Sequence, residues 1–547
     1  MASVSAHVAH ALALHVDHVF GVMGNGNAAL LDALDRTSAR YTALRHEAGG
    51  VVAADAYFRS SGRLAAATAT YGAGFTNTLT ALAESRQARI PVLLVVGDAP
   101  TGGPRPWDVD QAAMAAAARV PTFTIGRADA ASTTVRAIEH ALVHRTPVVL
   151  AIPYDLATAD AGETTEGLPP LALPAPLAPD AAGLDAAAAL LAHARRPFLL
   201  AGRGAWLAHA GEALGRLADA TGAVTASTTL ARGVFPDARY DLGVTGGFGQ
   251  AQAMALVREA DVAIVLGASL NQFTTRFGEL FAPGTRVVQV DVGSEATAPA
   301  VTDFVAGDAG LAASGLVDRL AASGATPSGW RESVDFSPLR PRDTGDGIAA
   351  DGRLDPRSVA ARIGELLPVD RVVVSDGGHF IGWANMYWPV ASPDRMIMVG
   401  TAFQSIGLGF PSVPGAATAR PDSTIVLTTG DGGGLMALAD LESAVRTAGG
   451  RGLAVVWNDA AYGAEVNLYG LKGYAEAPML IPEVDFAALA AAVGAEGVVV
   501  RELADLDRLA DWAAEPADSR PFLLLDCRIS GTVIAPYQHE IIAVSNR

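Results

Sequence analysis

Gly430-Asp431-Gly432 and Asn458 are of residue types that can bind a metal ion and a phosphate group. The apolar run "STIVLTT" comes directly before the glycine turn, and the run "GLAVVW" ends at Asn458, 27 positions after Asp431. Glycines let backbone N–H groups approach an anion closely, and a following helix N-terminus adds a favourable dipole. Carboxylate, amide or carbonyl, and phosphate oxygens are typical ligands of Mg²⁺. The pattern therefore predicts a Mg²⁺ and phosphate site, although Gly-Asp-Gly alone is also common in turns.

Other phosphate motifs have little support in this chain. It contains no G-x-x-x-x-G-K-[ST] segment, which excludes a P-loop. The glycine-rich segment "GVMGNGN" (21–27) does not match G-x-G-x-x-G, so a dinucleotide site there is weakly supported.

Two proline-rich stretches, 164–183 and 322–347, predict joints between domains. The expected domains are 1–165, 183–325 and 350–547, since 547 residues are too many for one hydrophobic core. In each domain, apolar runs alternate with helical segments, which predicts mainly parallel sheets covered on both faces. We therefore expect three doubly wound α/β domains.

Ligands of such sheets bind beyond the carboxyl ends of the strands, so the turns after the strands are the candidate sites. These turns are "GVMGNGN", "TYGAGFTN", "SDGGHF", "TTGDGGG" and "NDAAYG".

Composition restricts partners and compartment. The net charge is −18 and no Lys/Arg-rich block is present, which disfavours nucleic acid. No apolar run reaches the roughly 20 residues of a membrane span. The one cysteine, Cys527, permits no disulfide within the chain and fits a cytoplasmic protein; in its apolar run we expect it to pack as a small hydrophobe. The first 22 residues lack a basic region typical of signal peptides. Their four histidines could bind metal, but an amphipathic helix is the preferred interpretation.

The motifs together resemble a known family. Gly-Asp-Gly followed by Asn after about 25 to 30 residues is typical of enzymes that bind thiamin diphosphate. The order "FGVMGNGNAALLDAL", "RHEAGGVVAADAYFRSSGR", "TYGAGFTNTLTALAESRQARIPVLLVVGD", "GLGFPSVPGA", "TTGDGG", "NDAAYG" resembles the acetolactate synthase and pyruvate oxidase group along essentially the whole chain. The resemblance implies a pyrimidine-binding domain, a central domain and a diphosphate-binding domain, in that order.

The resemblance also implies roles for individual residues. Glu47 would hydrogen-bond a ring nitrogen of the cofactor's aminopyrimidine, which a carboxyl group in a dry pocket can do; the alternative is an ordinary helix start. Ile406 would wedge the cofactor into its bent shape, where relatives often carry Met. His379 would contact the diphosphate or the reacting end, or be structural. The other implied contacts are Asp431, Asn458 and Ala460 for Mg²⁺, and Asp376, Gly377, Gly378, Gly430, Gly432, Gly433, Ala461, Tyr462 and Gly463 for the cofactor.

The substrate pocket departs from the familiar patterns. Pyruvate decarboxylases carry a His-His pair that this chain lacks. "GGPRPWDVDQAAMA" replaces the Phe-Gln-Glu segment of acetolactate synthases, and "GVMGNGNAA" replaces a Pro-Gly-Gly turn. Solvated surface positions are the alternative for every candidate. The candidates are Asn25, Gly26, Asn27, Trp107, Asp108, Asp110, Gln111 (also as a catalytic group), Glu465, Asn467 and Tyr469.

The resulting hypothesis is a thiamin-diphosphate- and Mg²⁺-dependent lyase or carboligase. It would remove CO₂ from a pyruvate-like 2-oxo acid and join the remainder to a second carbonyl compound. The alternatives are simple decarboxylation, cleavage of a 2-hydroxy ketone or 2-hydroxyacyl thioester, or FAD-linked oxidation. FAD in the central domain, near Arg276, is left open and disfavoured. A non-catalytic subunit is disfavoured because Glu47 and the metal ligands are present. In such relatives the site lies between the first domain of one subunit and the third domain of its partner, which implies at least a homodimer and commonly a homotetramer.

Overall fold

The computed structural model describes residues 2–163 and 170–545. They form three six-stranded sheets whose strand pairings are all parallel, with helices between the strands. The predicted fold class, three doubly wound α/β units, is confirmed. Residues 164–169 of the predicted linker lie outside the described residues, and residues 170–180 contain no helix or strand.

The first sheet has the strand order β2-β1-β3-β4-β6-β5. Strands β3 and β4 are almost wholly buried, as expected for parallel strands covered on both faces. The elements are α1 (Val4–Ala13), β1 (His18–Gly21), α2 (Ala28–Leu34), β2 (Arg40–Ala43), α3 (Glu47–Ser61), β3 (Ala66–Ala69), α4 (Ala73–Thr76), α5 (Leu79–Gln87), β4 (Leu93–Asp98), α6 (Gln111–Ala117), β5 (Thr122–Thr124), α7 (Ala130–His144) and β6 (Val148–Pro153).

The central sheet has the order β12-β11-β10-β7-β8-β9. Its elements are α8 (Ala181–Ala192), β7 (Pro197–Ala201), α9 (Arg203–Leu207), α10 (Gly211–Thr221), β8 (Val224–Ser227), β9 (Asp241–Val244), α11 (Ala251–Val257), β10 (Val262–Leu266), β11 (Arg286–Asp291), β12 (Asp303–Ala306), α12 (Ala309–Ser323) and α13 (Trp330–Ser333). Helix α13 lies inside the stretch predicted to be a joint, and its Trp330 is buried against the central domain.

The third sheet has the order β14-β13-β15-β16-β18-β17. Its elements are α14 (Pro356–Leu366), β13 (Arg371–Ser375), α15 (Ile381–Tyr387), β14 (Met396–Met398), α16 (Gly409–Ala419), β15 (Thr424–Gly430), α17 (Asp431–Met436), α18 (Leu441–Ala448), β16 (Gly452–Asn458), α19 (Gly463–Tyr469), α20 (Phe486–Ala492), β17 (Glu496–Val500), α21 (Asp507–Ala514), β18 (Leu523–Arg528) and α22 (Pro536–Ser545). The chain changes direction across the sheet between β13 and β15, and ligands of doubly wound sheets bind at such a point.

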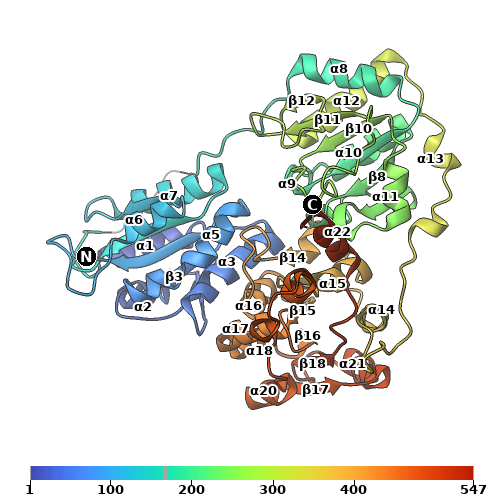
Figure 1. Cartoon of the computed structure of the whole chain (residues 1–547). Helices are drawn as coiled ribbons and strands as arrows, with labels where there is room; N and C mark the ends of the chain where they lie inside the picture. The colour runs from blue at the N-terminus through green and yellow to red at the C-terminus, as the bar shows by residue number, and fades with distance from the viewer. Residues whose placement is uncertain (1, 164–169, 546–547) are drawn as a thin grey trace.

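Helices α3 and α16 join the first and third domains within this chain (Figure 1). Gly415 of α16 faces the backbone of α3 so closely that an added Cβ would collide with the Ala53 carbonyl oxygen. Arg59 of α3 forms a buried ion pair with Asp55 (2.5 Å) and donates to the Met398 carbonyl (2.8 Å) at the end of β14. Apolar packing and a satisfied buried charge therefore hold the two domains together.

Among the described residues, no helix is both long enough and apolar enough to cross a membrane.

Candidate active site

Asp431 and Asn458 lie side by side at the carboxyl edge of the third sheet. Strands β15 and β16 pair with Gly430 opposite Trp457; Asp431 directly follows β15 as the first residue of α17, and Asn458 is the last residue of β16. Asp431 Oδ2 and Asn458 Oδ1 are both buried with no hydrogen-bond partner among the described residues. Buried oxygens of this kind are costly unless another group satisfies them. One carboxylate and one amide oxygen suit a hard cation such as Mg²⁺, so these residues fit the predicted ion.

Two carboxyl groups at this edge have raised pKa values. Burial, with a smaller contribution from Asp459, raises the pKa of Asp431 to about 7. Burial likewise raises the pKa of Asp459 to about 6. A divalent cation favours the charged form of a carboxylate it contacts and would lower the pKa of Asp431. Protons and a cation bound at this position would therefore compete for Asp431 near neutral pH.

The turn after β16 packs on the glycine turn after β15. Ala460 has a left-handed backbone (φ 58°), and its carbonyl accepts a hydrogen bond from Ile481 N–H (2.8 Å). A carbonyl oxygen has two lone pairs, so one remains for a cation. Gly432 lies under the ring of Tyr462, where an added Cβ would lie 2.6 Å from a ring carbon. Ala461 and Gly463 flank Tyr462 in the sequence, so the contact between Gly432 and the Tyr462 ring brings the two predicted diphosphate turns together.

Asp376 holds the loops around the switch point of the third sheet. It is fully buried and accepts hydrogen bonds from the N–H groups of Gly377 (2.8 Å), Gly407 (3.1 Å) and Leu408 (3.3 Å) and from the Thr429 hydroxyl (3.0 Å). Burial raises the pKa of this carboxyl group. Its side chain thus joins the end of β13, the loop that carries Ile406 and the strand that leads into Gly430.

Ile406 lies against Gly377, and the neighbouring turns contain further glycines in close surroundings. A Cβ added at Gly377 would lie 3.3 Å from Ile406 Cγ2. A Cβ added at Gly433 would lie 2.7 Å from Asp376 Oδ2. Gly378 has φ +138°, a conformation that side chains rarely adopt. These three positions therefore require glycine, because a side chain there would disturb the close packing of the loops that Asp376 holds together.

His379 is buried, and one nitrogen of its ring is engaged. Its Nε2 accepts a hydrogen bond from Ala535 N–H (3.0 Å), which places the proton of a neutral ring on Nδ1. Burial lowers the pKa of His379 to about 4, so the ring is neutral at pH 7. A Cβ added at Gly463 would lie 3.6 Å from Nδ1. The Tyr537 hydroxyl donates to the His379 carbonyl (2.9 Å). The Nδ1–H group therefore lies beside the turn that follows Asn458.

Glu47 is the first residue of α3 and is half-buried. One carboxyl oxygen accepts a hydrogen bond from Nδ2 of Asn77 (2.9 Å), the C-cap residue of α4. Two residues further along α3, an added Cβ at Gly49 would collide with Asp440 of the third domain. Arg45 N–H donates to Asp440 Oδ1 (2.8 Å). The start of α3 is thus fixed against the third domain, and Asn77 holds the Glu47 carboxylate.

Three family models match the chain in the order of its domains. Residues 2–114 match the N-terminal TPP binding domain of thiamine pyrophosphate enzymes, 184–316 the central domain, and 376–527 the C-terminal TPP binding domain. The chain belongs to the thiamine pyrophosphate enzymes. Its binding of thiamin diphosphate (thiamine pyrophosphate), predicted from the sequence, is supported by both TPP-binding domains.

Several characterised proteins resemble this thiamine pyrophosphate enzyme over most of their length. A sulfoacetaldehyde acetyltransferase of Rhodobacter capsulatus is 30% identical, and the match covers 91% of this chain and 90% of the relative. An acetolactate synthase of Mycobacterium avium is 27% identical, with 93% and 85% covered. A sulfoacetaldehyde acetyltransferase of Castellaniella defragrans is 29% identical, with 90% and 87% covered. The chain is thus an enzyme of this group.

The predicted substrate residues of this thiamine pyrophosphate enzyme occupy unlike environments. Gln111 is 3% exposed; its amide accepts from Gly72 N–H (2.7 Å) and donates to the Gly97 carbonyl (3.0 Å). Asn27 is also buried, with its amide bonded to Gly24 N–H, the Val22 carbonyl and the Thr68 hydroxyl. Both amides are occupied within the first domain, so they shape the turns there.

Other predicted substrate residues of the first domain are more exposed to solvent. Asn25 is exposed and donates to the Tyr71 hydroxyl (2.8 Å), whereas Gly26 packs on Thr70. Trp107 is 62% exposed beside Arg105.

Two carboxylates of the replaced segment have structural partners. Asp108 forms an ion pair with Arg105 (2.8 Å). Asp110 caps α6 by accepting from Ala113 N–H (2.9 Å).

The helix after the candidate metal turn presents one exposed acid. Glu465 of α19 is exposed, Asn467 is buried with its Nδ2 lacking a partner among the described residues, and Tyr469 stacks on Tyr474.

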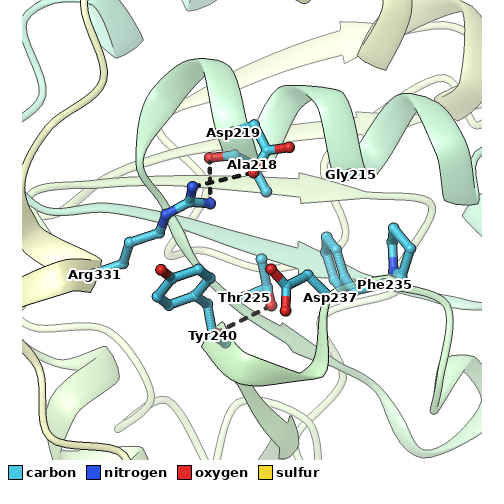
Figure 2. Close-up of a pocket in the computed structure, with 9 residues that line it drawn as sticks. Gly215, Ala218, Asp219, Thr225, Phe235, Asp237, Tyr240 and Arg331 are labelled. Atoms are coloured by element: carbon cyan, nitrogen blue, oxygen red, sulfur yellow. Dashed lines mark hydrogen bonds and ion pairs between the residues drawn. The ribbon is translucent and has the colours of Figure 1, made fainter.

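The central domain contains a crevice of about 200 Å³, shown in Figure 2. Arg331 of α13 extends into it, donating to the Ala218 carbonyl (3.2 Å) and to Asp219 (3.1 Å) and lying 4.3 Å above the Tyr240 ring. The crevice lies near the amino ends of β8 and β9, opposite to the edge where doubly wound sheets bind ligands. It anchors the segment that leads to the third domain.

Arg276, the residue placed near a nucleotide crevice, forms an ion pair with Glu540 of α22. Its guanidinium thus links the central domain to the C-terminal helix. FAD gains no support from the family descriptions or from the names of the relatives.

Proposed function

We propose that this thiamine pyrophosphate enzyme, with Mg²⁺, decarboxylates a pyruvate-like 2-oxo acid and joins the remaining acyl unit to a second carbonyl compound. Bound thiamin diphosphate would supply the electron sink for the carbanion that is left when CO₂ departs. The observation that carries the proposal is the pair of buried, unsatisfied oxygens on Asp431 and Asn458 beside a glycine turn. The similarity to acetolactate synthases supports the choice of substrate class.

The proposal gives each residue a task. Asp431, Asn458 and the Ala460 carbonyl hold Mg²⁺. Glu47, held by Asn77, exchanges a proton with a ring nitrogen of the cofactor. Ile406 supports the bent cofactor, and Asp376 keeps its loop in place. The diphosphate contacts are Gly377, Gly378, Gly430, Gly432, Gly433, Ala461, Tyr462 and Gly463.

The reacting end has its own group of residues. His379, neutral with a proton on Nδ1, donates a hydrogen bond toward the diphosphate or the substrate. Asn25, Gly26, Trp107 and Glu465 line the substrate entrance. Gln111 and Asn27 act as positioning residues for the first-domain turns rather than as direct contacts.

The decisive experiment is CO₂ release and product identification with a panel of 2-oxo acids. Each reaction is run with thiamin diphosphate and Mg²⁺ added or withheld. We expect CO₂ to depend on both cofactors and the product to contain a new carbon–carbon bond. If an aldehyde is the sole product, the enzyme catalyses simple decarboxylation without forming a new carbon–carbon bond. No CO₂ from any 2-oxo acid, in protein that binds the cofactor, would overturn the proposal.

A second candidate is acyl transfer from a sulfonated aldehyde, in which the carbon–sulfur bond breaks, sulfite leaves, and the acyl unit passes to an oxygen nucleophile such as phosphate that is added to the assay. It rests on the 30% identity to the sulfoacetaldehyde acetyltransferase of Rhodobacter capsulatus. Sulfoacetaldehyde therefore belongs in the substrate panel. Its cofactor-dependent consumption, without CO₂ release from any 2-oxo acid, would favour this second function.

We also propose that the active unit is at least a dimer, with each site shared between the first domain of one subunit and the third domain of its partner. Exposed apolar side chains on both domains support this proposal: Met23, Trp107, Phe403, Met436 and Tyr474. Co-expression of Glu47→Ala and Asp431→Ala chains tests it. Sites shared in this way would restore about a quarter of the wild-type activity, because half of randomly mixed dimers contain one intact site. A mixture without activity would show that the site forms within one chain, which the packing of α3 on α16 would allow.

A further inference from the structure

The amide group of Asn458 has one orientation that its surroundings permit. Its Nδ2 donates to Asp526 Oδ1 (2.9 Å) and to the Val484 carbonyl (3.1 Å). A carboxylate and a carbonyl are both hydrogen-bond acceptors, so an inverted amide would direct its oxygen at two other oxygens. The inverted form is therefore excluded, and Oδ1 must face the position beside Asp431 Oδ2.

Asp526 is itself held from its other side. It lies on β18, next to β16, with no exposed surface. Its second oxygen accepts from Phe486 N–H (3.0 Å) and from Arg528 Nη2 (2.7 Å). Arg528 is 5% exposed and forms a further ion pair with Glu483 (2.9 Å), which reaches the surface. A chain of four polar groups thus extends from the surface to Asn458.

We propose that Asp526 is a positioning residue for the metal site: it fixes the amide of Asn458 so that the oxygen, and not the NH₂ group, faces the cation. This inference rests on the proposed Mg²⁺ site. Groups that orient a metal ligand from behind commonly contribute 10- to 100-fold to metal affinity. Asp526 does not contact the ion, because its two oxygens are occupied by Asn458, Phe486 and Arg528.

The substitution Asp526→Asn tests this role with almost no change of volume. Asn has one acceptor oxygen, whereas the site contains three donors: the Asn458 amide, Phe486 N–H and Arg528. If the new NH₂ faces Asn458, the Asn458 amide is driven to invert and presents its NH₂ to the cation. If the new NH₂ group faces Phe486 and Arg528 instead, it points at two other donors, and these groups must move apart. In both arrangements the metal site loses its fixed oxygen.

The measurement is Mn²⁺ affinity in the full-length enzyme at saturating thiamin diphosphate, with free Mn²⁺ counted by electron paramagnetic resonance. We expect Asp526→Asn to raise the Kd for Mn²⁺ by about 10- to 100-fold. Asp485→Asn is the matched control: Asp485 lies nearby and caps α20 through Ala488 N–H (2.8 Å). Asn caps helices equally well, so the control should keep the wild-type Kd.

The possible results distinguish a positioning role of Asp526 from a merely structural one. A folded Asp526→Asn variant with wild-type Kd for Mn²⁺ overturns the inference, even if its melting temperature falls, because a merely structural residue would behave in that way. If the variant does not fold, Glu483→Gln at the exposed end of the chain of polar groups carries the test, with an expected increase in Kd that is smaller than about 10-fold. A wild-type Kd in Glu483→Gln would then reject the role. If the wild-type enzyme binds no Mn²⁺, both the proposed metal site and the inference are overturned. If the enzyme binds Mn²⁺ normally but is inactive toward 2-oxo acids, only the proposed reaction is overturned, and the inference about Asp526 stands.

Discussion

Metal binding by this enzyme should weaken as the pH falls from 8 to 6. The pKa of Asp431 without metal is about 7, because burial and the neighbouring Asp459 disfavour its charge. A cation binds the deprotonated carboxylate, so protonation must be reversed before the ion can enter. At pH 8 about nine-tenths of the Asp431 side chains are charged, and at pH 6 about one-tenth. The Kd for the metal should therefore rise about tenfold between these values.

The assay is Mn²⁺ binding at saturating thiamin diphosphate, measured at intervals between pH 5.5 and pH 8.5. The pH dependence of Mn²⁺ binding to free thiamin diphosphate is measured in parallel and subtracted, since the diphosphate also gains protons in this range. Asp459→Asn supplies the internal check. It removes one neighbouring negative charge, so the pKa of Asp431 should fall and the midpoint of the curve should move to lower pH. A corrected Kd that does not change with pH would refute the reasoning, as would a midpoint that moves upward in Asp459→Asn.

Three further predictions follow from the contacts described above. Glu47→Ala should lower turnover by about 10²- to 10⁴-fold while the melting temperature stays within a few degrees, because the half-buried carboxylate is proposed to have a catalytic rather than a packing role; normal turnover would exclude that role. Gly415→Ala should destabilise the enzyme by about 1–3 kcal/mol, since its Cβ meets the α3 backbone, whereas Gly102→Ala, with open space around it, should not; denaturant unfolding of both compares them. Tyr537→Phe should cost about 1–3 kcal/mol, because it leaves the His379 carbonyl without that donor; an unchanged unfolding midpoint would contradict this.

The parts of the site that follow from local pattern could be predicted from the sequence. Asp431 and Asn458 each follow an apolar run, and parallel strands bring such positions to one edge of a sheet. The fold class follows from the same alternation of apolar runs and helices. The fold class and the proximity of Asp431 and Asn458 could be predicted because each depends only on local sequence pattern and on the parallel pairing of neighbouring strands.

The parts that depend on distant partners could not be predicted in this way. The contact of Asp376 with the cofactor stays a prediction, but nothing in the sequence indicated that its carboxylate accepts from the N–H groups of Gly407 and Leu408, about 30 positions away. The bond from Ala535 N–H to His379 spans 156 positions and involves a backbone group that no side-chain pattern marks. Asn77 belongs to the segment "TYGAGFTN" that follows a predicted strand, so its place at the same sheet edge as Glu47 could be predicted, although the hydrogen bond between them could not.

The packing of α3 on α16 has a consequence for how the chain is made. The two helices are separated by about 360 residues, as the bond from Arg420 to the Ser60 carbonyl shows. A ribosome adds about 5–20 residues per second, so α3 emerges roughly 20 to 70 s before its partner helix exists. During that interval Val51, Val52 and Tyr57, which are buried in the finished molecule, lack the α16 part of the apolar cluster they later share. A nascent chain paused between the first and third domains should therefore bind holdase chaperones through α3, and release from them should coincide with synthesis of α16.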